Sequence, residues 1–206
     1  MPEASSIGPT RAHLGAILSA RGRGRSQGEQ VMVGCWPFSP SIHYHMGAEA
    51  LSDERIKALL SMKKRLTSSS SPKPRLKGKH EERDYTIVGD DGETRFVVYA
   101  RQNANLTDDF SCGLRWEAPS GESVTLIRMN GPSHVHPNRL EKTSIVAKCH
   151  VHMATTRYIQ AGLQPEGYAE ESFEYTDLEG ALRVLARVCN VDGFHFTPHQ
   201  MTLPQR

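Results

Sequence analysis

Four short runs of β-branched and aromatic residues, separated by turn-forming residues, constrain the fold of this 206-residue chain more than any other feature. Such runs favour β-strands, and the GDDGE and APSGE sequences between the first pair and the last pair are typical of hairpin turns. Strands that follow one another at this spacing predict an antiparallel meander. The runs cover residues 85–88, 96–101, 110–116 and 123–129.

A fifth strand is predicted over residues 144–152, where two sets of side chains alternate. Successive side chains of a strand point to opposite faces, so one set faces the core and the other faces outward. We expect the outward set to form a hydrated or functional face. The inward set is Ile145, Ala147, Cys149 and Val151, and the outward set is Val146, Lys148, His150 and His152.

Three helices are predicted around this sheet. Ser52 is a suitable N-cap for a helix over 53–66, in which acidic residues come first and basic residues last. A second helix is expected over 153–163, and a capping box at 176–179 begins a third. We therefore expect an α+β fold: a mostly antiparallel sheet of about five strands, with two C-terminal helices and one N-terminal helix, preceded by a disordered N-terminal arm.

The composition divides the chain into five parts. The first is rich in Gly, Ser, Pro and Arg and shows no sustained apolar period, so we expect a disordered extension, or residues upstream of a misassigned start codon. The parts are this extension at 1–45, a helix at 46–66, a basic flexible linker at 67–82, the α+β domain at 83–192 and a tail at 193–206.

Charge is distributed unevenly along the chain. Residues 1–80 contain 13 basic and 5 acidic side chains, whereas residues 81–206 contain 12 and 18, although the net charge of the whole chain is only +2. A basic arm attracts the phosphates of nucleic acids, although the same residues also suit an ordinary solvated linker. The candidate nucleic-acid-binding residues are Lys63, Lys64, Arg65, Lys73, Arg75, Lys77 and Lys79.

The sequence argues against a location in the membrane and against secretion. No apolar run approaches the roughly 20 residues that cross a bilayer, so we expect that the protein does not associate with a membrane. The N-terminus lacks the continuous apolar region of a secretory signal. The four cysteines are at least 37 positions apart, which favours free thiols in a reducing compartment. We therefore expect a cytoplasmic protein.

Histidines supply the candidate chemistry. Four of the ten form two His-x-His pairs, His134 with His136 and His150 with His152. Residues i and i+2 of a strand lie roughly 6 to 7 Å apart on one side, so both imidazoles of a pair can address one ligand. If the loop between the pairs folds back beside the fifth strand, all four converge. A neutral imidazole is a general base and a protonated one a general acid, so we predict that all four are catalytic.

The neighbours of these histidines fit phosphodiester chemistry. Arginine stabilises negative charge that develops on phosphorus oxygens, and asparagine shapes turns and donates hydrogen bonds. Structural roles stay open for the arginines, and simple packing stays open for Tyr158. The candidate substrate-binding residues are Arg128, Asn130, Asn138, Arg157 and Tyr158.

A metal site is the chemical alternative. Three or four histidines with an open position can hold zinc or another divalent metal, and the same His134, His136, His150 and His152 would be the ligands. The string HVHPNRLE, which ends at Glu141, resembles the first metal motif of cupins, although no second cupin motif follows. Acid-base catalysis by the histidines alone needs no cofactor.

Residues 83–192 resemble a family of uncharacterised bacterial domains, for which no activity is implied. A strand ending in Arg-x-Asn, a His-x-His turn and a closing helix are also similar to the TumE-like toxins of toxin-antitoxin systems. That similarity implies a functional cluster of Arg128, Asn130, His134 and His136, although the second His-x-His pair and the basic arm depart from the pattern. The family resemblance rests on RQN at 101–103, FSCGL at 110–114, RMNGPSHVHPN at 128–138, HVHMATTRY at 150–158 and EGYAE at 166–170.

Taken with these resemblances, the sequence predicts a small bacterial protein that acts on nucleic acid, a toxin-like ribonuclease whose RNA substrate supplies its own 2'-hydroxyl nucleophile. Its partners would be RNA and a cognate antitoxin or another protein encoded nearby. Two alternatives stay open. One is a non-enzymatic interaction module of a toxin-antitoxin or mobile-element system, and the other is a His-rich, cupin-like metal-binding protein.

Overall fold

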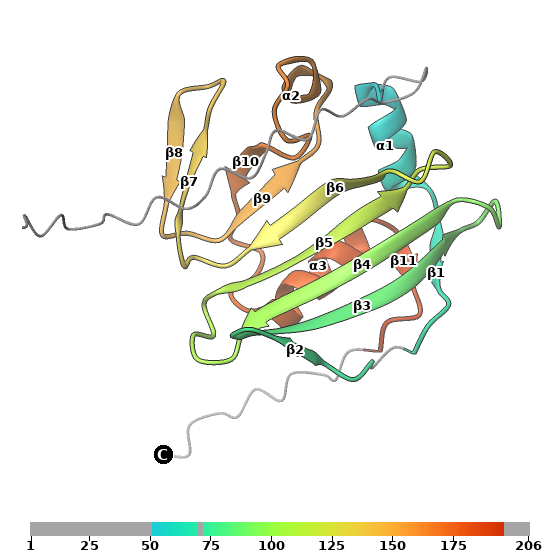
Figure 1. The fold of residues 1–206 in the computed structure, drawn as a ribbon, viewed down its shortest axis with the longest axis horizontal. Helices are drawn as coiled ribbons and strands as arrows, with labels where there is room; N and C mark the ends of the chain where they lie inside the picture. Colours follow the sequence, from blue (N-terminus) through green and yellow to red (C-terminus); the bar gives the residue numbers. More distant parts are fainter. Residues whose placement is uncertain (1–50, 70–71, 196–206) are drawn as a thin grey trace, which may run out of the picture. The chain divides into compact units, whose positions relative to one another are not determined.

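A computed structural model describes residues 51–69 and 72–195 of the chain (Figure 1). The predicted disordered extension and most of the predicted tail lie outside these residues. The described residues form three helices and 11 strands. In chain order these are α1 (Asp53–Ser61), β1 (Lys64–Leu66), β2 (Arg75–Lys77), β3 (His80–Gly89), β4 (Arg95–Asn103), β5 (Phe110–Glu117), β6 (Ser123–Asn130), β7 (Val135–Asn138), β8 (Thr143–Val146), β9 (His150–Met153), α2 (Thr156–Gln160), β10 (Tyr168–Glu171), α3 (Leu178–Val188) and β11 (Val191–Asp192).

Nine of these strands form one large sheet in the order β10-β9-β6-β5-β4-β3-β1-β11, with β2 paired to β3. The strands β3 to β6 are an antiparallel meander, which β9 and β10 extend beyond β6. β1 and β11 pair in parallel, so the sheet is mixed. The other two strands, β7 and β8, form a separate hairpin.

The expected sheet of about five strands is wrong, because the large mixed sheet contains nine. The four runs at 85–88, 96–101, 110–116 and 123–129 each lie within one of the strands β3 to β6. The strands that were missed have only two to four residues each. Segments this short hold too few side chains for an alternating pattern to stand out.

The predicted strand at 144–152 is in fact two strands in different sheets. β8 ends at Val146 and β9 begins at His150, and between them Ala147 has a φ of 49°, a left-handed conformation that interrupts a strand. In β9 the alternation holds, since Val151 packs against the core while His150 and His152 face the other way. That other face is buried rather than hydrated, because both histidines are 0% exposed.

Two of the three helices are shorter than the sequence predicts. α1 begins at the expected cap, where Ser52 Oγ accepts from the backbone N–H of Arg55, but it ends at Ser61 and β1 follows at once. α2 has five residues. α3 is capped by Asp177, whose carboxylate accepts from the backbone N–H of Gly180 at 2.7 Å, rather than by Thr176. In the described part of the chain, no helix is long and apolar enough to cross a membrane.

Parts of the predicted linker and tail also belong to the folded body. β2 and the start of β3 lie within the 67–82 segment. In the predicted tail, the ring of Phe194 lies 5.0 Å from that of Tyr85 between centroids. Pairing and packing therefore order segments whose composition alone is typical of loops.

The core lies between the sheet and α3, which packs on β4, β5 and β6 behind the sheet as it is seen in Figure 1. Burying a large apolar side chain contributes roughly 1.5–3 kcal/mol, so this layer is a main source of stability. The buried side chains include Ile87, Phe96, Leu114, Leu126 and Leu185.

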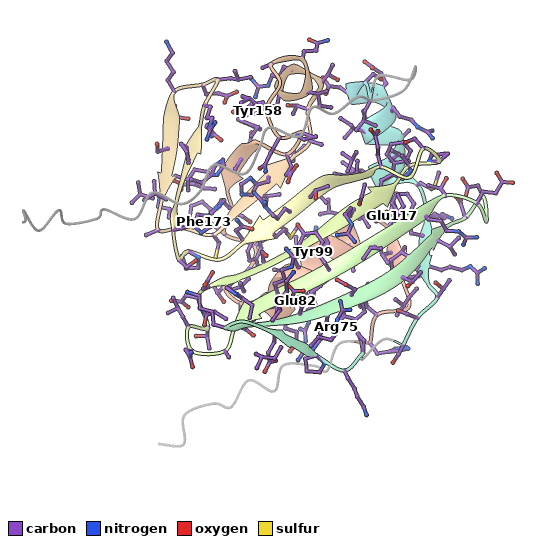
Figure 2. All side chains as sticks on the ribbon, viewed as in Figure 1. Arg75, Glu82, Tyr99, Glu117, Tyr158 and Phe173 are labelled. Atoms are coloured by element: carbon purple, nitrogen blue, oxygen red, sulfur yellow. The ribbon has the colours of Figure 1, made fainter. Side chains whose placement is uncertain are left out.

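The opposite face of the sheet carries polar side chains. Tyr99 on β4 and Glu82 on β3 lie on this face and are labelled in Figure 2. Arg128 and Asn130 on β6 belong to the same face, because residues i and i+2 of a strand point the same way. The β7–β8 hairpin packs beside β10 at one end of this face, and the candidate site lies there.

Candidate functional site

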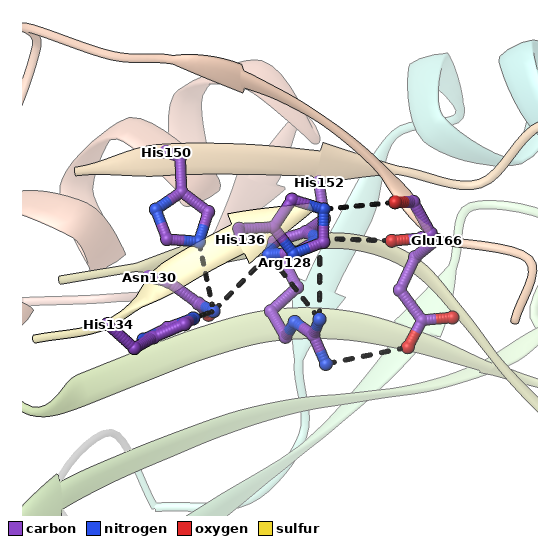
Figure 3. Close-up of polar contacts among 8 residues, drawn as sticks. Arg128, Asn130, His134, His136, His150, His152 and Glu166 are labelled. Carbon is purple, nitrogen blue, oxygen red and sulfur yellow. Dashed lines mark hydrogen bonds and ion pairs between the residues drawn. The ribbon is translucent and has the colours of Figure 1, made fainter. Parts of the chain in front are cut away.

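The candidate site begins with two neighbouring strands. His150 and His152 are residues i and i+2 of β9, so they point to one face of the sheet. β9 pairs with β6 in a register that sets Asn130 opposite His150 and Arg128 opposite His152. Cross-strand neighbours have Cβ atoms about 5 Å apart, so these four side chains form one patch (Figure 3).

His134 and His136 reach this patch from the hairpin. The ring centroid of His134 lies 5.0 Å from that of His150. The ring of His136 lies 5.5 Å from that of His150 and 4.3 Å from that of His152. His134 is exposed, whereas His136 is half-buried and the other two are fully buried. All four predicted catalytic residues therefore converge, and we refer to them as the histidine cluster.

Backbone carbonyls orient three of these rings. A carbonyl oxygen only accepts hydrogen bonds, so the ring nitrogen facing it carries the proton and donates. The other nitrogen of each ring is then unprotonated, so Nε2 of His150 and His152 and Nδ1 of His136 each carry a lone pair that can accept a hydrogen bond or bind a metal. The three contacts are His150 Nδ1 to Lys148 O at 2.7 Å, His152 Nδ1 to Glu166 O at 3.0 Å and His136 Nε2 to Gly167 O at 3.0 Å.

The same three histidines lie close enough together to share a metal ion. One nitrogen from each of His136, His150 and His152 lies within 4.8 Å of the others. Imidazole nitrogens bound to zinc lie about 2.1 Å from the ion, and hence about 3.4 Å from one another in a tetrahedral site. A contraction of up to about 1.4 Å would bring these nitrogens to coordinating distance. His134, the fourth ligand predicted from sequence, is not one of this group.

The side-chain amide of Asn130 lies within the cluster. Its Nδ2 is 3.3 Å from His152 Nε2 and 3.5 Å from Nε2 of both His150 and His134. An amide nitrogen has two hydrogens, so it cannot satisfy three acceptors. Its Oδ1 is buried and has no hydrogen-bond partner among the described residues. A buried polar atom of this kind usually has a partner, and a water, an ion or a ligand in the cluster could supply one.

Arg128 places a positive charge beside the cluster. Its Nη2 lies 3.3 Å from Nδ1 and 3.4 Å from Nε2 of His152, so it lies between the two nitrogens rather than along one lone pair. Its Nη1 lies 3.7 Å from Oε1 of Glu166, whose side chain is 11% exposed. Glu166 therefore balances Arg128 with its carboxylate and orients His152 with its carbonyl. Sequence reasoning missed Glu166, because a single glutamate in a loop belongs to no pattern.

Burial keeps the imidazoles neutral. Desolvation lowers the pKa of His150 to about 4 and that of His152 to about 2, and for His152 the charge of Arg128 is the next cause. Desolvation also lowers the pKa of His134 and of His136. At neutral pH the cluster therefore offers lone pairs rather than protons. Lone pairs suit metal ligands and general bases better than general acids.

A polar pocket of about 320 Å³ opens beside the cluster. Small-molecule sites typically measure roughly 300–1,000 Å³, so this space fits a small polar ligand. Arg128, Asn130 and His134 form the wall nearest the buried histidines. The other lining residues include His80, Glu82, Tyr99, Arg101 and Asp109.

Three predicted substrate-binding residues instead contact the protein outside the pocket. The amide of Asn138 pairs with the backbone of Ala169 on β10. Glu141 forms an ion pair with Arg157 at 2.5 Å and accepts a hydrogen bond from the Tyr158 hydroxyl at 2.6 Å. These contacts hold the hairpin against β10 and α2. Glu141, the last residue of the cupin-like string, is therefore directed away from the histidines.

The predicted nucleic-acid-binding residues do not line the pocket either. Lys64 is buried, and its Nζ donates to three backbone carbonyls. Arg75 forms an ion pair with Asp84 at 2.6 Å. The remaining residues are exposed along β1 and on both sides of β2, and they are Lys63, Arg65, Lys73, Lys77 and Lys79.

Comparison with known proteins places the whole site within one family. A family model described as a family of unknown function (DUF6978) matches residues 51–191, which include the histidine cluster and the pocket. No curated protein and no solved structure matches the chain. The expected membership of an uncharacterised family is therefore confirmed, whereas the similarity to TumE-like toxins receives no support from these comparisons.

Proposed function

The chain belongs to DUF6978, a family of unknown function, and from the geometry of its histidines we propose that it binds one divalent transition-metal ion through His136, His150 and His152. One observation carries the proposal: in each of these rings one N–H donates a hydrogen bond to a backbone carbonyl, which leaves the other nitrogen unprotonated. Histidine ligands of metals are oriented in this way, because the outer hydrogen bond fixes both the tautomer and the direction of the ring.

The ligand set indicates what the ion would do. Three imidazoles with a further position open are the ligands of catalytic zinc sites, and imidazole also suits iron, copper and nickel. An ion held in this way lowers the pKa of a bound water and polarises a carbonyl or phosphoryl oxygen. Arg128, Asn130 and His134 lie between the buried ligands and the pocket, where a substrate would approach. The corresponding activity is metal-dependent hydrolysis.

The proposal is tested by metal analysis of the full chain, purified without chelators and then incubated with Zn²⁺ or Co²⁺. We expect about one ion per chain, and at least a tenfold loss of metal affinity in His150→Ala and in His136→Ala. His195→Ala is the matched control, since this histidine is exposed and distant in sequence. Substoichiometric metal in the wild-type chain after reconstitution would contradict the proposal. So would a metal affinity in His150→Ala and His136→Ala equal to that of wild type.

A second candidate is the metal-independent cleavage of RNA expected from the sequence, and His134 is the observation that favours it. Ser133 Oγ donates to Asp109 at 3.3 Å and lies 3.4 Å from His134 Nδ1. These hydrogen bonds can move a proton between the exposed ring of His134 and Asp109 in the pocket, and the charge of Arg128 lies nearby. Under this candidate function the exposed basic residues would bind RNA, and the protein partner would be an antitoxin.

RNA integrity assays separate the two candidates. Cleavage that persists after chelation and disappears in His134→Ala supports the metal-independent reaction. Cleavage that chelation abolishes and Zn²⁺ or Co²⁺ restores supports the metal centre instead. Full cleavage by both His134→Ala and His150→Ala would rule out the metal-independent role of the cluster.

A further inference from the structure

The charges around the histidine cluster do not balance once a metal ion is bound. Three neutral imidazoles contribute no charge, so a divalent ion adds two positive charges to that of Arg128. Glu166 offsets one of the three, with its carboxylate 3.7 Å from Arg128. A net charge of about +2 at a largely buried site is costly unless an anion compensates it.

From this imbalance we infer that the metal centre binds a dianionic phosphate group between the ion and Arg128, which makes phosphate monoesters its substrate class. The inference rests on the proposed metal site. A phosphate monoester carries a charge close to −2 at neutral pH, so it neutralises the centre, whereas a carboxylate or a phosphodiester supplies only about −1.

The spacing of Arg128 fits such a bridge. Its Nη2 lies 3.4 Å from Nε2 of His152, so an ion about 2.1 Å from that nitrogen lies within about 5.5 Å of Nη2. An oxygen bound to the ion at about 2.1 Å and to the guanidinium at about 2.9 Å spans up to about 5 Å. One phosphate oxygen can therefore contact both wherever the ion lies within about 5 Å of Nη2, which is most of this range, and the flat arginine fork can hold a second oxygen.

The other charges of the pocket are already compensated. Glu82 and Arg101 form an ion pair at 3.3 Å. Asp109 accepts from Asn103 at 2.9 Å and also contacts His80 and Ser133. Arg128, by contrast, has only the longer contact to Glu166 as an ion pair, and its Nε lacks a hydrogen-bond partner among the described residues. Its charge is therefore the one available to an anion that enters the pocket.

This arrangement requires that metal and phosphate bind cooperatively. Each ligand reduces the electrostatic cost of the other, and the coupling of two equilibrium affinities is reciprocal. We expect inorganic phosphate to bind the metal-loaded chain at least tenfold more tightly than the metal-free chain. Phosphate must then raise the affinity for the metal by the same factor.

The test is a calorimetric titration of the full chain with inorganic phosphate, with and without bound Co²⁺, and in the loaded chain the visible absorption of Co²⁺ also reports a change of its ligands. Glycerol 2-phosphate, dimethyl phosphate and acetate are titrated in parallel, as a monoester, a diester and a carboxylate. We expect phosphate and the monoester to bind, and the two monoanions to bind at least tenfold more weakly. Equal binding of acetate or dimethyl phosphate would overturn the assignment of the substrate class.

Arg128→Gln separates this inference from the metal site itself. Removing the positive charge should leave metal affinity unchanged or increased, while phosphate affinity falls at least tenfold. Arg115→Gln is the matched control, because Arg115 pairs with Glu117 and does not line the pocket. Arg128→Lys retains the charge without the planar guanidinium, so it should keep only part of the phosphate affinity. If Arg128→Gln fails to fold, Arg128→Lys takes its place in the test.

The outcomes distinguish two failures. If neither zinc nor cobalt binds, the proposed function fails together with the inference. If the metal binds at one equivalent but phosphate affinity is the same in wild type and Arg128→Gln, the inference is overturned and the metal site stands.

Discussion

The side-chain amide of Asn138 pairs with both backbone polar groups of Ala169, as a neighbouring strand would. Nδ2 donates to the carbonyl at 2.8 Å, and Oδ1 accepts from the N–H at 2.9 Å. Asn138 closes β7 and Ala169 lies in β10, an end strand of the large sheet. This pairing holds the hairpin beside the sheet and so places His136 over His150 and His152.

Asn138→Ala is therefore expected to weaken both stability and metal binding. Two buried backbone groups lose their partner, which costs about 2 to 4 kcal/mol of unfolding free energy. Because His136 is two residues away on the same strand, metal affinity should fall about 10-fold or more. Urea denaturation and Co²⁺ titration measure the two effects. Asn105→Ala is the control, an exposed asparagine that should change neither; undiminished metal affinity in Asn138→Ala would show that the hairpin does not position His136.

Lys64 joins the ends of two helices to the sheet. Its Nζ donates to the carbonyls of Leu60 and Met62, at the end of α1, and of Cys189, at the end of α3, at 2.7 to 2.9 Å. Burial lowers the pKa of Lys64 to about 8, so the amine is still mostly charged at neutral pH. A positive charge is favourable at the C-terminal ends of helices.

Lys64→Met should destabilise the protein by about 3 kcal/mol, because three carbonyls lose a charged donor that an apolar side chain cannot replace. Chemical denaturation compares it with Lys63→Met, whose side chain is exposed and whose cost should stay within about 0.5 kcal/mol. Similar losses in both variants would show that the three contacts to Lys64 contribute little.

Lys64 and Asn138 also show which roles a sequence pattern can predict. A basic residue in a basic segment indicates a phosphate-binding surface, and an asparagine beside His-x-His indicates a site. Lys64 instead donates to the carbonyl of Cys189, 125 positions away, as well as to two nearby carbonyls, and Asn138 pairs with Ala169, 31 positions away. Local spacing cannot specify partners so far away, and the same limit explains why the contact of Glu166 with Arg128 was missed.

Periodic features were more accessible to prediction. The strands β3, β4, β5 and β6 contain eight to ten residues each, enough for their composition to be recognised. The same-face geometry of His150 and His152 follows directly from the period of a strand. The break at Ala147 has no such signal, because alanine does not favour the positive φ that it adopts between the end of β8 and the start of β9.

Acid should destabilise the metal-free protein through the buried histidines. The pKa of His150 is about 4 when folded, against about 6.5 in an unfolded chain, so the unfolded state binds the proton more readily. The contribution of neutral His150 to the free energy of unfolding is therefore complete above pH 6.5. It is lost as the pH falls toward 4, and at pH 4 the loss is roughly 3 kcal/mol. Arg128, His134 and His136 face the ring and make its protonation still less favourable.

Urea denaturation of the chelated chain between pH 7.5 and pH 4 measures this effect. His150→Asn removes the titrating group, so its stability should decline less steeply than that of wild type over this range. His195→Ala keeps the cluster intact and should follow the wild-type curve. Parallel curves for His150→Asn and wild type would contradict the prediction.

Gly113 on β5 permits the close approach of Tyr99, which lines the pocket. A Cβ at this position would lie 2.5 Å from the Tyr99 hydroxyl and 2.6 Å from the backbone oxygen of Ile127. The backbone oxygen cannot move without shifting β6, which carries Arg128 and Asn130. Gly113→Ala should therefore cost about 1 to 3 kcal/mol of unfolding free energy. In a double-mutant cycle the cost should be smaller in a Tyr99→Leu background, because the shorter side chain removes one of the two clashes. Equal costs in the two backgrounds would mean that Tyr99 does not lie across Gly113.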